Sequence, residues 1–222
     1  MTVDFMYRIC QYCVNKAQNG YLTPEEFNLT IHQAQLSYAS SLIGHQQQYQ
    51  YGRSQSRISF GQNENVRQSL TPVIYSVRIP VDTFGFSPYP TDYQKMDAII
   101  DIYGHPVRFI SQDRSYSYLS STIDPIATNP GYELVYNGFR FYPSSIGNVD
   151  LSYVRKPPSI VWGYTQNPLT GEPIYNPLTS SDPVWFDVDC FDIIVRALKM
   201  IGVNLQAADV YRFADEVKNA GQ

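Results

Sequence analysis

The chain has 222 residues, of which 14% are aromatic and 16% are charged, and its formal net charge is −4. This composition excludes ordinary disorder, because disordered chains are rich in charge and poor in aromatic residues. The acidic balance does not favour a protein that holds nucleic acid statically, which normally carries a basic excess or patch. No run of 18 apolar residues predicts a membrane span, and the N-terminus does not resemble a secretory signal.

Two helices are predicted within residues 1–45. The first is expected to stop at Gly20 and to place four side chains on one apolar face, namely Phe5, Ile9, Tyr12 and Cys13. The second begins at Thr23-Pro24-Glu25-Glu26, where Thr23 can cap the helix and Glu26 can reach back to the cap. Its apolar residues recur at helical spacing as far as about Gly44 and are Phe27, Ile31, Ala34, Tyr38 and Leu42.

Residues 46–69 are poor in apolar side chains and rich in Gln, Ser, Asn and Arg, which predicts a long loop or arm. Its cationic and aromatic residues could stack on single-stranded nucleic acid, although arms of this kind more often contact protein. The residues concerned are Tyr49, Tyr51, Arg53, Arg57, Phe60 and Arg67.

Residues 70–156 predict a β module of four to six short antiparallel strands. Apolar residues alternate with others as in half-buried strands, and they are Val73, Tyr75, Val77 and Ile79 early in the module and Val149, Leu151 and Tyr153 at its end. Between them, Tyr136-Asn137-Gly138-Phe139 predicts a two-residue type I′ hairpin, because Asn-Gly accepts the positive dihedral angles of that turn.

Residues 157–183 contain repeated prolines, which exclude a helix and predict an extended, semi-rigid arm. A third helix is expected to start at Asp182-Pro183 or at the acids just after it and to stop at Gly202, and a last helix is expected from Asn204. The third helix would bury Phe191, Ile194, Val195, Leu198 and Ile201. Residues 1–45 and 184–222 should pack as one helical module, so the predicted class is α+β with an inserted antiparallel β module.

The motifs predict no catalytic, cofactor or metal site. A zinc site at Cys10-x-x-Cys13 would need a second ligand pair, and a redox site would need the cysteines at a helix start after a strand. Both cysteines are therefore predicted to be core residues, and the odd total of three cysteines suits a reducing compartment. Asp187, Asp189 and Asp192 are expected to complement a helix dipole rather than to bind Mg²⁺. Without a phosphate-binding loop or a nucleophile elbow, the chain is not predicted to be an enzyme.

The sequence resembles the ring proteins of the neck and tail of short-tailed bacteriophages, particularly the crAss-like phages. The resemblance rests on GYLTPEEFNLTIHQAQ (20–35), on LSYVRKPPSIVWGY (151–164), on residues 176–216 and on Pro90-Thr91-Asp92-Tyr93, which is similar to a Pro-x-Asp-Tyr step of tail tubular proteins. It implies a closed ring, commonly of twelve copies, that stacks on the portal and transmits DNA through its lumen. It also implies a virion location in the neck or tail after synthesis in the host cytoplasm.

We therefore expect a structural head–tail connector that forms a homo-oligomeric ring and contacts the portal and neighbouring ring or tail proteins. Double-stranded DNA would pass through without sequence-specific binding, and neither a membrane nor a cofactor would take part. The low charge and high Tyr content agree with a surface that contacts neighbours. Candidate interface residues are Tyr49, Tyr51, Arg53, Arg57, Phe60, Arg67, Trp162, Tyr164, Tyr175 and Trp185.

Two alternatives remain open at this stage. A Tyr-rich β module could bind host carbohydrate or another host surface at the tail, which predicts a monomer or trimer with a concave aromatic site. A weaker alternative is a nucleic-acid-binding protein that uses the Arg-containing arm.

Overall fold

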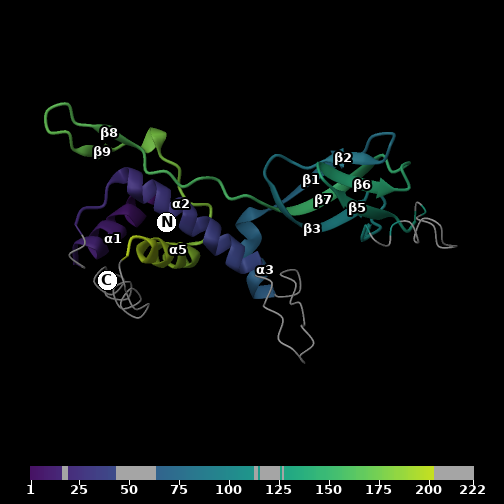
Figure 1. Ribbon diagram of the computed structural model, residues 1–222, viewed down its shortest axis with the longest axis horizontal. Coiled ribbons are helices and arrows are strands. Elements are labelled where there is room, and N and C mark those ends of the chain that lie inside the picture. The colour runs from purple at the N-terminus through teal and green to yellow at the C-terminus, as the bar shows by residue number, and fades with distance from the viewer. Residues whose placement is uncertain (17–19, 44–63, 113–114, 116–125, 127, 203–222) are drawn as a thin grey trace, which may run out of the picture. The chain divides into compact units, whose positions relative to one another are not determined.

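The computed structural model describes residues 1–16, 20–43, 64–112, 115, 126 and 128–202 (Figure 1). The chain forms two compact units, one from residues 1–72 together with 157–222 and the other from residues 73–156. The predicted α+β class is confirmed, because strands form a module inserted between helical parts of the chain. Among the helices of the described ranges, none is long and apolar enough to cross a membrane.

In the described part of the first unit, three long helices share one core. They are α1 (Val3–Lys16), α2 (Pro24–Ile43) and α5 (Asp187–Met200), and α5 packs against both α1 and α2. The predicted capping box of α2 is confirmed, because the Thr23 N–H donates to Glu26 at 3.0 Å and the Glu26 N–H donates to Thr23 at 3.3 Å. The largest fully buried side chains on these three helices are Met6, Phe27, Ile31, Ile193, Ile194 and Leu198.

Two predictions for the helical parts are wrong in detail. Ile9 and Cys13 are buried as predicted, but Phe5 and Tyr12 are 42% and 46% exposed. The buried stripe of α1 consists instead of Val3, Met6, Tyr7, Ile9, Cys10, Cys13 and Val14. Part of the predicted arm forms α3 (Glu64–Leu70), in which Glu64 suits the first turn and Leu70 is buried. Residues 44–63 of that arm, and the last helix predicted from Asn204, lie outside the described residues.

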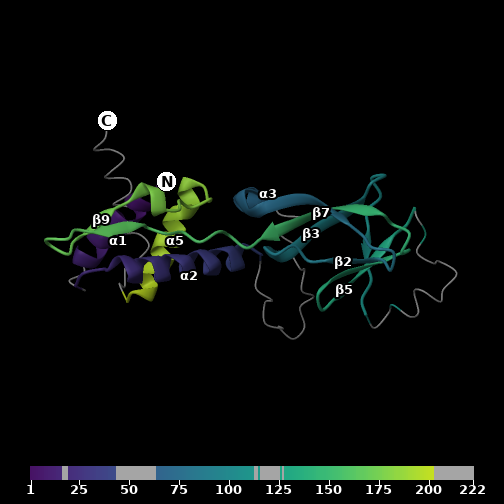
Figure 2. The same cartoon turned by 90° about the horizontal axis from the view of Figure 1, so that it is seen from above.

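Residues 157–183 form a β-hairpin and a short 3₁₀ turn, which the prediction of an extended arm did not include. β8 (Tyr164–Gln166) pairs with β9 (Pro173–Tyr175), and η2 (Pro177–Thr179) comes next. The prolines do not prevent this. Pro173 is the first residue of β9 and Pro177 is the first residue of η2, and proline is tolerated at both kinds of position. The hairpin lies beside α1 and belongs to the same compact unit (Figures 1 and 2).

Polar side chains of α2 form hydrogen bonds with the backbone of residues 158–162, just before the hairpin. The Asn28 amide pairs with both backbone groups of Trp162: Nδ2 donates to the carbonyl oxygen at 3.2 Å, and Oδ1 accepts from the N–H at 2.7 Å. About two turns further along the helix, Gln35 Nε2 donates to the Pro158 carbonyl oxygen at 2.7 Å, and Gln35 Oε1 accepts from the Trp185 indole at 3.2 Å. Side-chain amides thus take the place of a neighbouring strand.

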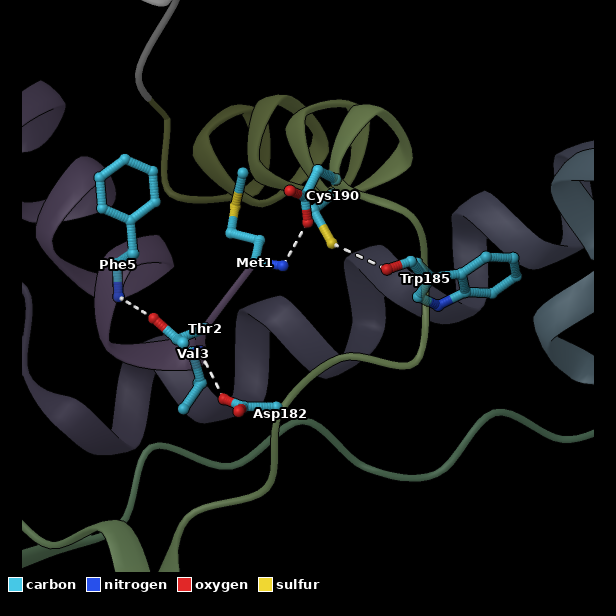
Figure 3. Close-up of polar contacts among 8 residues, drawn as sticks. Met1, Thr2, Val3, Phe5, Asp182, Trp185 and Cys190 are labelled. Carbon is cyan, nitrogen blue, oxygen red and sulfur yellow. Dashed lines mark hydrogen bonds and ion pairs between the residues drawn. The ribbon is translucent and has the colours of Figure 1, made fainter. Parts of the chain in front are cut away.

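The segment before α5 is also tied to the start of α1 (Figure 3). The Val3 N–H donates to Asp182 at 2.7 Å. Within the C-terminal segment itself, the Cys190 thiol of α5 donates to the Trp185 carbonyl oxygen at 3.7 Å. On the opposite side, the Tyr38 hydroxyl of α2 donates to the buried carboxylate of Asp189. The beginning of α5 is therefore fixed by contacts with both N-terminal helices.

Replacing Asn28 with Ala should destabilise the first unit by about 1–3 kcal/mol, because both backbone groups of Trp162 lose their partner. Chemical denaturation monitored by tryptophan fluorescence measures this change. Leu29→Ala is the matched control on the same helix, since Leu29 is 66% exposed and its loss should change stability by less than about 0.5 kcal/mol. Equal stability of the two variants would contradict the proposed role of Asn28.

In the described residues of the second unit, seven strands form two sheets around one aromatic core. The sheets have the orders β1-β7-β3 and β2-β6-β5-β4, and their strands are β1 (Ile74–Pro80), β2 (Phe86–Pro88), β3 (Tyr93–Asp101), β4 (Arg108–Phe109), β5 (Gly131–Val135), β6 (Gly138–Tyr142) and β7 (Asn148–Arg155). Val149, Leu151 and Tyr153 are buried in β7 as predicted. The prediction of a purely antiparallel module is wrong at one pair, because β4 runs parallel to β5.

The predicted Asn-Gly hairpin exists, but its turn is displaced by one residue. Val135 pairs with Gly138, so the two loop residues are Tyr136 and Asn137, and Gly138 is the first residue of β6. Gly138 is needed for close approach: a Cβ atom there would lie 2.2 Å from the Ser87 carbonyl oxygen in β2. The Asn-Gly pair thus predicted the hairpin correctly. Gly138 is required, however, because β2 packs closely against it, and not because its backbone has a positive dihedral angle.

Gly138→Ala should therefore destabilise the β module by about 1–3 kcal/mol, because the backbone of β2 must move to accommodate the methyl group. Gly147→Ala is the control, since a Cβ at Gly147 meets nothing within 4 Å. Thermal unfolding followed by near-ultraviolet circular dichroism compares the two variants. A stability loss equal in both would show that the close contact is not the cause.

Candidate assembly surfaces

The base of the β8–β9 hairpin is anchored by Trp162, which is only 4% exposed. Its ring contacts Tyr7 at a centroid distance of 4.3 Å and Tyr175 at 5.6 Å, and its indole N–H donates to Asp4 at 3.1 Å. The prediction of Trp162 as an interface residue is therefore wrong, because its surface is used within its own unit. Trp185 is corrected in the same way: it is 4% exposed and bonded to α2.

Hydrogen bonds of the Gly163 backbone connect the residues just before β8 to the residues just after β9 at this base. The Gly163 N–H donates to Ser180 Oγ at 2.9 Å, and the Gly163 carbonyl accepts from the Asn176 N–H at 2.9 Å. A Cβ at Gly163 would lie 2.2 Å from Thr179 Oγ1, so the two segments approach closely. The hairpin is consequently an extension of the helical core with a fixed orientation in its own unit.

Two apolar side chains near this hairpin are almost completely exposed. Leu169, in the loop between β8 and β9, and Leu178, in η2, are each 94% exposed. Each lies in the tetrapeptide Asn-Pro-Leu-Thr, which occurs at residues 167–170 and again at 176–179. In both copies the Asn side chain accepts a hydrogen bond from the Leu N–H at 3.0 Å. Such an Asx turn fixes the backbone that carries the exposed side chain.

The β module presents two exposed aromatic residues with the same local construction. Phe84 is 85% exposed and its N–H donates to Asp82 at 2.9 Å, whereas Tyr103 is 77% exposed and its N–H donates to Asp101 at 2.9 Å. Their turns come after β1 and β3, which run in the same direction beside β7. Both therefore lie at one end of that sheet, opposite the end where the chain enters and leaves the module.

Asp101 is the most constrained of these turn residues. Its carboxylate is buried and accepts from the backbone N–H groups of Tyr103 and His105 and from His105 Nδ1 at 2.8 Å. Burial by itself would raise the pKa of Asp101, but the hydrogen bonds from His105 and Tyr103 outweigh it and lower the pKa below the ordinary 3.8. The ionised carboxylate is thus the form that holds the Tyr103 turn.

A lowered pKa stabilises the folded protein above the ordinary value, and this contribution is lost as pH falls through the lowered pKa. Asp101→Asn should therefore reduce the free energy of unfolding at pH 7, and the gap to the native chain should shrink as the pH falls below 3.8. Urea denaturation of both chains over this pH range measures the gap. A gap that is independent of pH would contradict an ionised Asp101 in the turn.

A cleft of about 620 Å³ lies between α1 and the β8–β9 hairpin. Its floor is formed by Tyr7 and Trp162, and its rim includes the Asp4–Arg8 ion pair, whose oxygen and nitrogen are 2.8 Å apart. The other lining residues are Gln11, Tyr21, Thr170, Gly171, Glu172, Pro173 and Tyr175. The cleft thus combines aromatic rings with carboxylate, amide and hydroxyl groups.

The remaining predicted interface residues are only partly described. Tyr49, Tyr51, Arg53, Arg57 and Phe60 lie outside the described residues. Arg67 is half-buried on α3, and Tyr175 is half-buried on β9. Tyr164 is also half-buried, and its hydroxyl donates to Glu25 at 3.3 Å. Sequence reasoning missed the four exposed apolar residues, although the repeated Asn-Pro-Leu-Thr was a usable signal.

Cys10 and Cys13 are core residues, as predicted, and Cys190 is buried as well. Burial raises the pKa of the Cys13 thiol and raises that of Cys190 to about 11. Of the acids near α5, Asp187 and Asp189 lie in its first turn and Asp192 lies beyond it. Within the described ranges, no three His, Cys, Asp or Glu side chains converge as they would to hold a metal ion.

No protein-family model matches the chain, and a search of curated proteins finds no significant match.

Proposed function

We propose that the protein is a structural subunit of a closed, twelvefold ring in the neck or tail of a crAss-like short-tailed phage. The ring would join the portal to the tail and line the channel through which DNA passes. The supporting observation is the set of exposed apolar residues on Asx turns, namely Phe84, Tyr103, Leu169 and Leu178. Side chains fixed in this way can gain burial against another molecule.

The energetics favour such contacts. Full burial of a Leu or Phe side chain contributes about 1.5–3 kcal/mol, and a backbone already held by an Asx turn loses little conformational entropy on binding. Each copy can offer its hairpin to one neighbour and accept a hairpin from the other. Contacts of this head-to-tail kind close into a ring when the rotation between copies permits.

The charge of the chain agrees with passive passage of DNA. A net charge of −4 does not provide the dense phosphate contacts that would retain double-stranded DNA. The proposed mechanism is therefore geometric: copies seal against one another and against the portal and tail proteins, and DNA moves through the lumen without a chemical step. No catalytic role is proposed for any residue.

The carbohydrate-binding alternative requires a concave aromatic site, and the cleft beside the hairpin is the described feature closest to it. The cleft lies in the helical unit, however, whereas the alternative expected the site in the β module. Its Trp162 ring is 4% exposed and already contacts Tyr7, Tyr164 and Tyr175. A sugar ring would therefore find little of the indole surface on which to stack, and we favour assembly.

Replacing Leu169 and Leu178 together with Asp should abolish or strongly weaken oligomer formation while the variant keeps its melting temperature, because both side chains are exposed. Light scattering coupled to size exclusion measures the mass, and negative-stain images of native particles should show rings. Leu29→Asp is the control, since Leu29 is also an exposed Leu but lies on α2, outside both Asn-Pro-Leu-Thr turns. A native chain that stays monomeric at high concentration would overturn the proposed function, and normal rings of the double variant would exclude the hairpin contact.

A further inference from the structure

We propose that the cleft between α1 and the β8–β9 hairpin receives residues 46–63 of a second copy of this chain. This inference rests on the proposed function, because it assumes that copies assemble. It concerns a cleft that adjoins the Leu169 turn, since Thr170 and Gly171 line it and follow Leu169 directly. It assigns a role to the polar arm that the exposed apolar residues do not explain.

The floor of the cleft and the Asp4–Arg8 pair on its rim are already bonded within the unit. Asp4 accepts from the Trp162 indole and pairs with Arg8, and the Tyr7 hydroxyl donates to the Leu22 carbonyl oxygen at 3.0 Å. Glu172 is different, because it is exposed, its carboxylate accepts only from the neighbouring Thr170 hydroxyl at 3.4 Å among the described contacts, and no Lys or Arg among the described residues forms an ion pair with it. The rim is therefore where a cationic guest gains most.

Exposed rings and uncharged polar groups complete the rim. Tyr21 is 59% exposed and Tyr175 is half-buried, so both present ring surface to the cleft. Gln11 adds an amide that can bond to a peptide backbone or to Gln side chains. The combination suits a guest that carries guanidinium groups, phenol rings and amides.

Residues 46–63 have this composition. The segment contains Arg53 and Arg57 and no acid, so its formal charge is opposite to that of Glu172. It also contains Tyr49, Tyr51 and Phe60 together with six Gln residues, which are Gln46, Gln47, Gln48, Gln50, Gln55 and Gln62. Arg pairs with carboxylates through a planar fork and also stacks on aromatic faces, so it can use both parts of the rim.

The geometry of α2 favours a neighbour's arm over the chain's own arm. Tyr21 and Glu25, at the N-terminal end of α2, lie at the cleft or beside the hairpin, whereas residue 44 comes after the opposite end of this 20-residue helix. The two ends are roughly 28 Å apart at 1.5 Å per residue. The 20 residues between Ile43 and Glu64 leave the end of α2 and must return to the start of α3. Even fully extended, such a loop reaches no further than about 34 Å from its two ends. The chain's own cleft would therefore need an almost fully extended loop.

The test is cross-linking between two marked copies of the full chain. One copy carries Ser56→Cys in the arm, the other carries Thr170→Cys in the cleft, and the two are co-expressed and treated with a short bismaleimide. The native cysteines are buried, so the native chain should remain uncross-linked. A dimer band is expected from the mixture and from neither variant alone, and Thr91→Cys, at an exposed Thr in the β module, should give no band when it replaces Thr170→Cys.

Glu172→Gln in the cleft copy should lower the cross-linked fraction about two- to fivefold, as expected for loss of one exposed ion pair. Oligomers that form without any cross-link would overturn this inference and leave the proposed function intact. A chain that carries both Ser56→Cys and Thr170→Cys and cross-links only within itself would show that the arm fills its own cleft. That result would also overturn this inference. A monomer without cross-links would overturn both proposals.

Discussion

The backbone that leaves β7 has to find hydrogen-bond partners outside any regular sheet, and the first unit is organised around that requirement. A buried N–H or C=O without a partner costs free energy comparable to a lost hydrogen bond. Asn28 and Gln35 of α2 provide the partners for Trp162 and Pro158. Because a carboxamide carries both a donor and an acceptor, one Asn side chain can satisfy both groups of one residue, as a neighbouring strand would.

The position of Trp162 then determines where the β8–β9 hairpin begins. Once the Trp162 backbone is bound to α2, its ring enters the aromatic group with Tyr7 and Tyr175, and the hairpin must start at the edge of the helical core. The strong contacts are at the base, and the apolar side chain of Leu169 is left in solvent at the loop. A rigid base with an exposed apolar loop is the arrangement expected of a contact that is completed by another molecule.

The parts that could be predicted from the sequence are those fixed by local rules. The capping box and apolar spacing of α2 and the alternation in β7 depend on neighbours a few residues away, so they were predicted with accurate positions. The use of Trp162 and Trp185 depends on partners more than 120 residues away. Composition alone cannot distinguish a Trp that is buried within its own chain from one buried by a partner. The displaced Gly138 turn has the same cause, since β2 sets its constraint.

The exposed apolar residues show how a local rule could nevertheless have indicated the surface. Ordinarily a single exposed Leu or Phe needs no explanation, because much of a protein surface is apolar. At four turns, however, an Asp or Asn two residues earlier accepts the N–H of the exposed residue, and Leu169 and Leu178 occur in identical tetrapeptides. An Asx turn reduces backbone freedom before any partner binds, so less entropy remains to be lost on association. The pattern Asx-x-apolar therefore combines local order with an uncovered side chain, which is a stronger indication of a contact surface than exposure alone.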